Sequence, residues 1–293
     1  MVKTTRSVLV TLILSLLLTT PAWSEPVKLA VFPSNDPVKL HRVMDIIARY
    51  LSETTGDQVS AIVTSDYKEL TDRLRENSVD LAWINTLNYV RVKREIPAIR
   101  YLATYLERNE DTGTIMPYYQ SYIIALRASS LNSLADAKGL RFAFTDKGST
   151  SGYAYPAMLL ASQGIDPDSY FSKIFFLKKH DRVIEALLSG SIDLGAVSDG
   201  TYFTAVRTRG ELFTILAKSD PIPLDAIVAA PHFSPAKMIR YQHALVTMPA
   251  DHEFCSAMRD VLGWSAAGFS VLDDGFYDHV RQALKDDPRC RCG

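Results

Sequence analysis

The chain has 293 residues, of which 47% are hydrophobic, enough to bury one large core or two moderate ones. Its 32 lysine and arginine residues balance 33 aspartate and glutamate residues, for a formal net charge of -1. This balance excludes the long-range field of a protein that attracts nucleic acid or an anionic membrane surface. Any anion that binds here must be held by local contacts.

The first 24 residues have the pattern of a secretory signal peptide. Lys3 and Arg6 form a short basic region, Val8 to Leu18 is apolar, and residues 22–24 (Ala-Trp-Ser) resemble a cleavage site. The alternative is a permanent membrane anchor, but that needs about 20 apolar residues, more than this run contains. We expect export to the periplasm and cleavage near Ser24.

The cysteines, Cys255, Cys290 and Cys292, are odd in number and do not form a disulfide framework. Cys255 could pair with one of the two cysteines near the C-terminus, or it could be a lone buried residue on an apolar helix face. No metal-binding motif such as HExxH is present, so we expect neither a metal nor a cofactor.

Short β-branched runs alternate with amphipathic stretches, which predicts an α/β architecture with largely parallel sheets. Asp36 is expected to cap a helix that has Pro37 at its first position and ends at Gly56. The predicted buried face of this helix consists of Leu40, Val43, Met44, Ile47, Ala48 and Leu51. The other elements expected in this part are strands at Val27–Phe32, Val59–Thr64 and Val79–Ile84 and a helix at Tyr67–Glu76.

One internal similarity organises the chain. The stretch from Asp66 to Ile84, a helix followed by a strand, is echoed from His180 to Val197. Two copies are too few for a solenoid, so the predicted fold is two similar α/β lobes that face each other and are joined by two crossover strands. We place the first lobe at residues 25–118 and 221–293 and the second at residues 119–220.

We expect the chain to pass between the lobes twice. Residues 107–117 form a surface loop, and a strand at Tyr118–Leu126 enters the second lobe. A strand at Leu212–Ala217 leads to the return crossing, where Pro221 and Pro223 favour extended backbone. The remaining expected strands are Arg141–Thr145, Lys173–Leu177 and Ile192–Val197, and the remaining expected helices are Pro235–Met248, Glu253–Leu262 and Asp278–Lys285.

The strongest candidate for a binding site is the segment 146–152 (DKGSTSG). It follows a strand and opens a helix predicted from about Gly152 to Gln163. The orphan N–H groups of such a turn and the hydroxyls of Ser149, Thr150 and Ser151 can converge on one oxyanion at the positive end of the helix dipole. The simpler alternative is that Ser149 or Thr150 is only the helix N-cap.

Catalytic interpretations of this segment fit less well. The nucleophile elbow G-x-S-x-G needs a serine at its centre, where this chain has Thr150. The segment also lacks the spacing and the lysine of a phosphate-binding P-loop. We therefore expect no enzymatic activity.

Five features in chain order resemble the periplasmic phosphate/phosphite/phosphonate-binding protein family. They are SDY at 65–67, VDLAW at 79–83, GSTSG at 148–152 with Tyr153 and Pro156 downstream, His180-Asp181 at a helix start, and PIPLDAI at 221–227. The resemblance covers residues 27 to about 265. It implies the two-lobed type II periplasmic binding fold, which closes on its ligand and delivers it to an ABC transporter.

Position by position, the resemblance implies a set of ligand-binding residues: Ser149, Thr150, Ser151, His180, Tyr67, Tyr119 and Asp225. Tyr118 is an alternative to Tyr119, and Asn85 and Thr86 could replace a contact at the cleft edge. Asp225 would accept a hydrogen bond from the ligand and would be a buried like charge against fully ionised sulfate. Without the resemblance, Asp225 would be a turn residue, His180 a helix cap, and the tyrosines ordinary half-buried aromatics.

The sequence thus predicts a solute-binding protein that captures a small oxyanion, similar to phosphonate, phosphite or phosphate, between two lobes. Its expected partner is an ABC transporter permease, with no nucleic acid, and we expect a monomer. The alternative is a periplasmic ligand sensor that presents its bound state to the periplasmic domain of a sensor histidine kinase.

Overall fold

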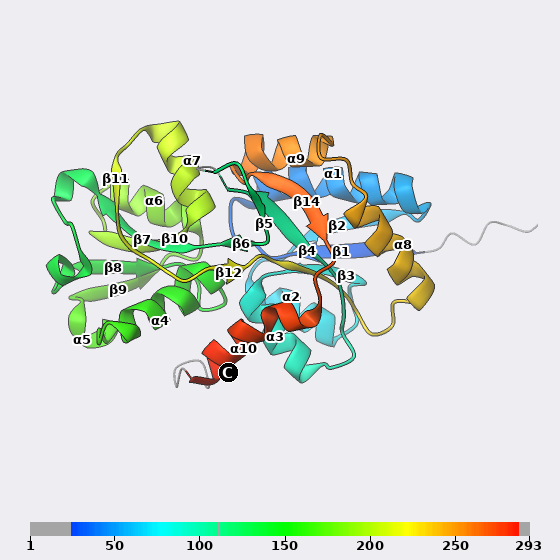
Figure 1. Cartoon of the computed structure of the whole chain (residues 1–293), viewed down its shortest axis with the longest axis horizontal. Helices are drawn as coiled ribbons and strands as arrows, with labels where there is room; N and C mark the ends of the chain where they lie inside the picture. Colours follow the sequence, from blue (N-terminus) through cyan, green and yellow to red (C-terminus); the bar gives the residue numbers. More distant parts are fainter. Residues whose placement is uncertain (1–24, 110–111, 287–293) are drawn as a thin grey trace, which may run out of the picture.

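The computed structural model describes residues 25–109 and 112–286. Two lobes, each built around its own sheet, lie side by side along the long axis of the molecule (Figure 1). The predicted signal peptide and Cys290 and Cys292 lie outside the described residues. Among the helices in the described part of the chain, none is long and apolar enough to cross a membrane.

The sheet of the first lobe has the strand order β14-β4-β13-β3-β1-β2, with β5 paired to β4. The strands are β1 (Val27–Val31), β2 (Val59–Val63), β3 (Leu81–Ile84), β4 (Arg100–Arg108), β5 (Ile115–Met116), β13 (Ala226–Ala229) and β14 (Ala266–Ser270). Strands β1, β2 and β3 are parallel to one another, whereas β13 is antiparallel to β3 and β4, and β14 to β4. The prediction of a largely parallel sheet is wrong here, because β13 returns from the second lobe in the opposite direction.

Helices cover both faces of this sheet (Figure 1). They are α1 (Pro37–Thr55), α8 (Pro235–Val246) and α9 (Glu253–Ala257) on one side, and α2 (Tyr67–Arg75), α3 (Thr86–Glu95) and α10 (Asp278–Asp286) on the other. As predicted, the Asp36 carboxylate caps α1 by accepting from two backbone N–H groups, and Gly56 ends it at φ 75°. All six predicted apolar residues of α1 are buried. The single helix predicted at Glu253–Leu262 is α9 followed by a π-helical turn at Met258–Leu262.

The sheet of the second lobe has the order β11-β7-β10-β8-β9. Its strands are β7 (Ser121–Leu126), β8 (Arg141–Phe144), β9 (Lys173–Phe176), β10 (Leu194–Ser198) and β11 (Phe213–Lys218); its helices are α4 (Tyr155–Ser162), α5 (Pro167–Tyr170), α6 (His180–Leu188) and α7 (Asp199–Arg209). Consecutive residues of β8, Phe142 and Ala143, belong to two different hydrophobic clusters. Apolar side chains on both faces, as expected of a sheet covered by helices on each side, make this a three-layer lobe.

The predicted internal similarity has a structural basis. In the first lobe, Asp80 precedes β3 and its carboxylate accepts from the backbone N–H of Lys28 in β1, over 2.8 Å. In the second lobe, Asp193 precedes β10 and its carboxylate accepts from the backbone N–H of Arg141 in β8, also over 2.8 Å. Each aspartate therefore joins its strand to the neighbouring strand in the same way.

Two short strands, β6 (Tyr118–Tyr119) and β12 (Ile222–Pro223), pair antiparallel where the chain passes between the lobes (Figure 1). The predicted strand at Tyr118–Leu126 is interrupted at Gln120, whose backbone N–H donates to Asp199. Residues 107–117 are not purely a loop, because β5 pairs with the end of β4. The predicted Leu212–Ala217 strand is β11, at the edge of the second sheet.

Candidate functional site

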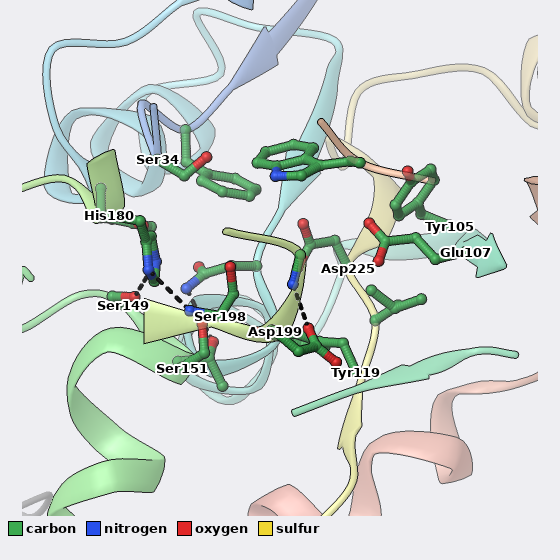
Figure 2. Close-up of a pocket in the computed structure, with 17 residues that line it drawn as sticks. Ser34, Tyr105, Glu107, Tyr119, Ser149, Ser151, His180, Ser198, Asp199 and Asp225 are labelled. Carbon is green, nitrogen blue, oxygen red and sulfur yellow. Dashed lines mark hydrogen bonds between the residues drawn. The ribbon is translucent and has the colours of Figure 1, made fainter. Parts of the chain in front are cut away.

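All seven residues predicted to bind a ligand line one cavity between the lobes (Figure 2). The cavity has a volume of about 50 Å³, room for a few waters or one compact oxyanion. The residues that line it are Phe32, Ser34, Tyr67, Asn85, Tyr105, Glu107, Tyr119, Ser149, Thr150, Ser151, His180, Ser198, Asp199, Gly200, Leu224, Asp225 and Trp264.

The cradle, residues 148–152, lies between β8 and α4. Its second half lies in a π-helical turn at Thr150–Ala154. Helix α4 begins after this turn, at Tyr155, which is later than predicted. The Ser149 hydroxyl oxygen accepts from the backbone N–H of Gly152 over 3.0 Å, so Ser149 does cap the turn. Because that bond uses an oxygen lone pair, the hydroxyl proton stays available to a guest.

Two glycines let the cradle lie where it does. A Cβ on Gly148 would come within 2.6 Å of the Cβ of Tyr67, which belongs to the first lobe. A Cβ on Gly152 would come within 1.8 Å of Thr145 Oγ1 in the same lobe. Gly148 therefore allows the close approach of the two lobes, and Gly152 allows the turn itself.

Thr150 is bonded from the first lobe. Its hydroxyl oxygen accepts from the backbone N–H of Leu87 and from Nδ2 of Asn85, each over 3.0 Å. Both lone pairs are thereby used, and its proton is left to donate. Of the two edge residues noted in the sequence, Asn85 lines the cavity, whereas the Thr86 hydroxyl donates to the carbonyl oxygen of Pro223 over 2.5 Å.

His180 presents a defined nitrogen to the cavity. Its Nδ1 accepts from the backbone N–H of Ser198 over 3.1 Å, so the neutral ring carries its proton on Nε2. Nε2 lies 3.4 Å from the Ser149 hydroxyl oxygen. Burial lowers the pKa of His180 to about 4. The N-cap of α6 is Lys179, so the interpretation of His180 as a helix cap is wrong.

Asp225 lies between β12 and β13 with its carboxyl in the cavity. Burial raises its pKa to about 7, although the Trp83 indole N–H donates to Oδ2 over 3.2 Å and opposes this shift. The group therefore changes its protonation state near neutral pH. Such a carboxyl can accept from a ligand when ionised and donate to one when protonated.

Two of the tyrosines reach the cavity and one does not. Tyr67 is buried and stacks on Phe32, with ring centroids 5.4 Å apart, and burial raises the pKa of its hydroxyl. Burial, followed by the charge of Asp225, raises the pKa of Tyr119 well above its usual value. Tyr118 is exposed and packs against Phe276, which excludes it as the alternative to Tyr119.

Sequence reasoning missed several cavity residues, among them Ser34, Tyr105, Glu107 and Asp199. The hydroxyl of Ser34 is buried with no hydrogen-bond partner. Ser34 was within reach of prediction, since it closely follows β1 and ligands gather at the carboxyl ends of strands. Glu107 was assigned to a surface loop, and Asp199 begins α7, a helix that the sequence analysis did not identify. In the described ranges, His, Cys, Asp and Glu form no cluster of three that could hold a metal.

Comparison with known proteins agrees with this geometry. A family model described as "ABC transporter, phosphonate, periplasmic substrate-binding protein" matches residues 29–277. The phosphate-import protein PhnD of Mycolicibacterium smegmatis is 28% identical over 285 residues, spanning 90% of this chain and 86% of that protein.

Two solved structures share the fold. PhnD1 of Prochlorococcus marinus in complex with methylphosphonate has a TM-score of 0.77 at 20% identity, covering 88% of this chain and 97% of that one. A binding protein component of a phosphonate ABC transporter from Pseudomonas aeruginosa has a TM-score of 0.75 at 23% identity, covering 89% of this chain and 87% of that one. The predicted fold class, two α/β lobes of the type II periplasmic binding arrangement, is confirmed.

Proposed function

The chain belongs to the family of periplasmic substrate-binding proteins of phosphonate ABC transporters, and from this premise we propose that its interlobe cavity binds a compact, phosphonate-like oxyanion. The family serves transport, and neither its description nor the name of the relative from M. smegmatis supports the sensor-kinase alternative. The observation that carries the proposal is a wall of hydrogen-bond donors that faces a wall of carboxyl groups across one small cavity (Figure 2).

The donor wall consists of Ser34, Tyr67, Ser149, Thr150, Ser151 and His180. The hydroxyl proton of Thr150 is free to donate to a guest, since both lone pairs of its oxygen are already used. The Nε2–H of His180 faces the cavity with only a long contact, 3.4 Å, to the Ser149 hydroxyl oxygen. The orphaned Ser34 hydroxyl adds a donor from the first lobe. Each hydrogen bond to a charged oxygen contributes about 1.5–3 kcal/mol, so four or five give roughly micromolar affinity after association costs.

The opposite wall carries Glu107, Asp199 and Asp225. Above pH 7, where the Asp225 carboxyl is ionised, a fully ionised guest such as sulfate would bring negative charge against it and offer it no proton. A phosphonate or phosphate monoanion presents a P–OH, and a short amino substituent presents N–H groups; either can donate to Asp225. We propose that the requirement of Asp225 for a donor selects the ligand, because a site built to hydrogen-bond a group that the wrong guest lacks can discriminate by about 10⁴.

The relatives support a ligand of this size. One is described as importing phosphate, and one was solved with methylphosphonate, and both molecules are compact enough for a cavity of about 50 Å³. The remaining parts of the proposal follow from a receptor of this kind. The first lobe (residues 25–118 and 221–293) moves against the second (residues 119–220) about hinges at Tyr119 and at residues 221–225. The protein acts as a monomer, and its closed form docks on a permease. It catalyses no reaction. The mature chain begins near Glu25 after export.

Thermal unfolding of the mature protein against phosphate, phosphite, methylphosphonate, aminoethylphosphonate and sulfate tests the proposal. A bound ligand at 100 times its dissociation constant adds roughly 2.7 kcal/mol to the free energy of unfolding. We expect such a shift for at least one phosphorus oxyanion and none for sulfate. If no phosphorus compound raises the unfolding temperature, or if sulfate raises it equally, the proposal is wrong.

A further inference from the structure

A group of hydrogen bonds beside the cavity joins the start of α3, in the first lobe, to the cradle in the second. Nδ2 of Asn85 donates to the carbonyl oxygen of Gly148 over 2.9 Å and to the Thr150 hydroxyl over 3.0 Å. Nδ2 of Asn88 donates to the same Gly148 carbonyl over 2.8 Å and also contacts Oδ1 of Asn85. Both asparagine residues are buried. No ligand atom is needed to complete these bonds.

The same contact completes a helix. Asn85 is the N-cap of α3 but makes no side-chain capping bond, because its Oδ1 accepts from Asn88 instead. The backbone N–H of Leu87, in the first turn, donates to Thr150 across the cleft. The N-cap side chain normally accepts a hydrogen bond from such an amide, but here the acceptor is a residue of the other lobe. Separation of the lobes leaves this amide and both asparagine side chains to water.

We propose that Asn85 and Asn88 are positioning residues that form an asparagine clasp, which holds the cradle against the first lobe and thereby sets the population of the closed form. The apparent dissociation constant of a ligand rises in inverse proportion to the fraction of binding-competent protein. Asn88 does not line the cavity, so it acts on affinity through its bonds to Asn85 and to the cradle rather than by contact with a ligand. The predicted effect of the clasp on ligand affinity rests on the proposed function.

The test compares Asn88→Ala and Asn88→Asp in the mature chain, with phosphate and methylphosphonate as probes. Loss of a buried hydrogen bond should raise the dissociation constant about tenfold in Asn88→Ala. Asn88→Asp should bind still more weakly, because a carboxylate oxygen would face the carbonyl oxygen of Gly148. Aspartate in the first turn of a helix interacts favourably with the helix dipole, so destabilisation of α3 would not explain weaker binding. The higher dissociation constant should come from a faster dissociation rate, with little change in the association rate.

Asn132→Ala is the matched control, since Asn132 is exposed and its amide donates within the second lobe to Ser130. Its dissociation constants should equal those of the wild type. A dissociation constant for Asn88→Ala within twofold of the wild type, or equal binding by Asn88→Ala and Asn88→Asp, would overturn the clasp.

Small-angle X-ray scattering separates this failure from that of the proposed function. Without any ligand, the wild type should have a smaller radius of gyration than Asn88→Asp. If the wild type binds neither probe, the proposed function fails, and the comparison of these radii still decides for or against the clasp: equal radii overturn it.

Discussion

The backbone N–H of Ser198 donates to Nδ1 of His180 over 3.1 Å, and so the ring must turn a protonated Nε2 toward the cradle. Ser198 is the last residue of β10 and the N-cap of α7. The tautomer of His180 is thus set by the backbone at a strand end, and burial keeps the ring neutral. A neutral donor of this kind offers one hydrogen bond without adding a charge to the cavity.

We predict that the His180 ring stays in the Nε2–H form and does not titrate between pH 5 and pH 8, because burial lowers its pKa to about 4. The ¹⁵N chemical shifts of the ring, measured in the ligand-free protein across this range, report both the tautomer and the charge. A midpoint near 6.5 for His180, or a proton on Nδ1, would remove its assigned role as a neutral donor.

Asp225 should make stability fall as pH rises. Its carboxyl has a pKa of about 7 in the folded protein against 3.8 ordinarily. Between these values the folded protein holds more protons than the unfolded chain, so stability declines from pH 4 to pH 7 and then levels off. The loss is at most about 4 kcal/mol, because each unit of pKa difference corresponds to about 1.4 kcal/mol. Asp225→Asn should therefore be more stable than the wild type at pH 8 and approach it near pH 4.

Urea unfolding of the ligand-free proteins at several pH values measures this difference. The control is Asp251→Asn, which removes an exposed carboxyl and should follow the wild type at every pH. His180 acts in the opposite direction, because its lowered pKa makes stability fall as pH drops from 6.5 to 4. The comparison of Asp225→Asn with the wild type cancels that contribution. A constant difference between them across the pH range would mean that Asp225 has an ordinary pKa.

The acidic wall should affect discrimination between phosphorus oxyanions and sulfate more than it affects affinity for the phosphorus oxyanion. Asp225→Asn and Glu107→Gln each remove a negative charge from the cavity and can still accept a hydrogen bond. We predict that both variants keep binding the phosphorus oxyanion and begin to bind sulfate, so that the ratio of the two dissociation constants, measured by calorimetry at pH 8, falls at least tenfold. Sulfate that stays excluded from both variants would place the selectivity elsewhere.

The predicted helices that match the structure best have one apolar face and clear ends. Helix α1 is the best example, with Asp36 at its start, Gly56 at its end and one buried face. Helix α7 was missed because it lies at the lobe interface and carries threonines and aromatics around its circumference rather than on one side. Strand β13 was missed because four residues after a proline-rich crossing give too short a pattern.

The site divides in the same way. The cradle could be predicted because its glycines and hydroxyls are consecutive in the sequence, whereas the acidic wall comes from three separate segments that only the crossing of the chain brings together. Asn85 shows the limit most clearly. Its place after β3 suggested the cleft edge, but its bonds to Gly148 and Thr150 span more than sixty residues of sequence and no local pattern encodes them.

Removal of the cradle hydroxyls should abolish binding. Ser149→Ala with Thr150→Ala deletes two donors and should eliminate the ligand-dependent rise in unfolding temperature. The ligand-free variant should also lose about 1–2 kcal/mol, since Ser149 caps the turn and Thr150 accepts two buried hydrogen bonds. Ser162→Ala, an exposed serine near the end of α4, is the control and should respond to ligand as the wild type does. A double variant with an undiminished response would show that the cradle is misplaced.

The two cradle glycines should fail in different ways when replaced by alanine. The Gly152→Ala methyl would meet Thr145 within the second lobe, in the open and the closed protein alike, so this variant should unfold several degrees lower with or without ligand. The Gly148→Ala methyl would meet the Cβ of Tyr67, which lies in the other lobe, so the clash exists only when the lobes are closed. Because a Cβ is fixed to the backbone, Tyr67 cannot simply rotate away. Gly148→Ala should lower the unfolding temperature of the ligand-free protein less than Gly152→Ala does, show the larger radius of gyration of an open protein, and lose ligand affinity by at least a hundredfold. Tight binding by Gly148→Ala would contradict closure of the cradle onto Tyr67.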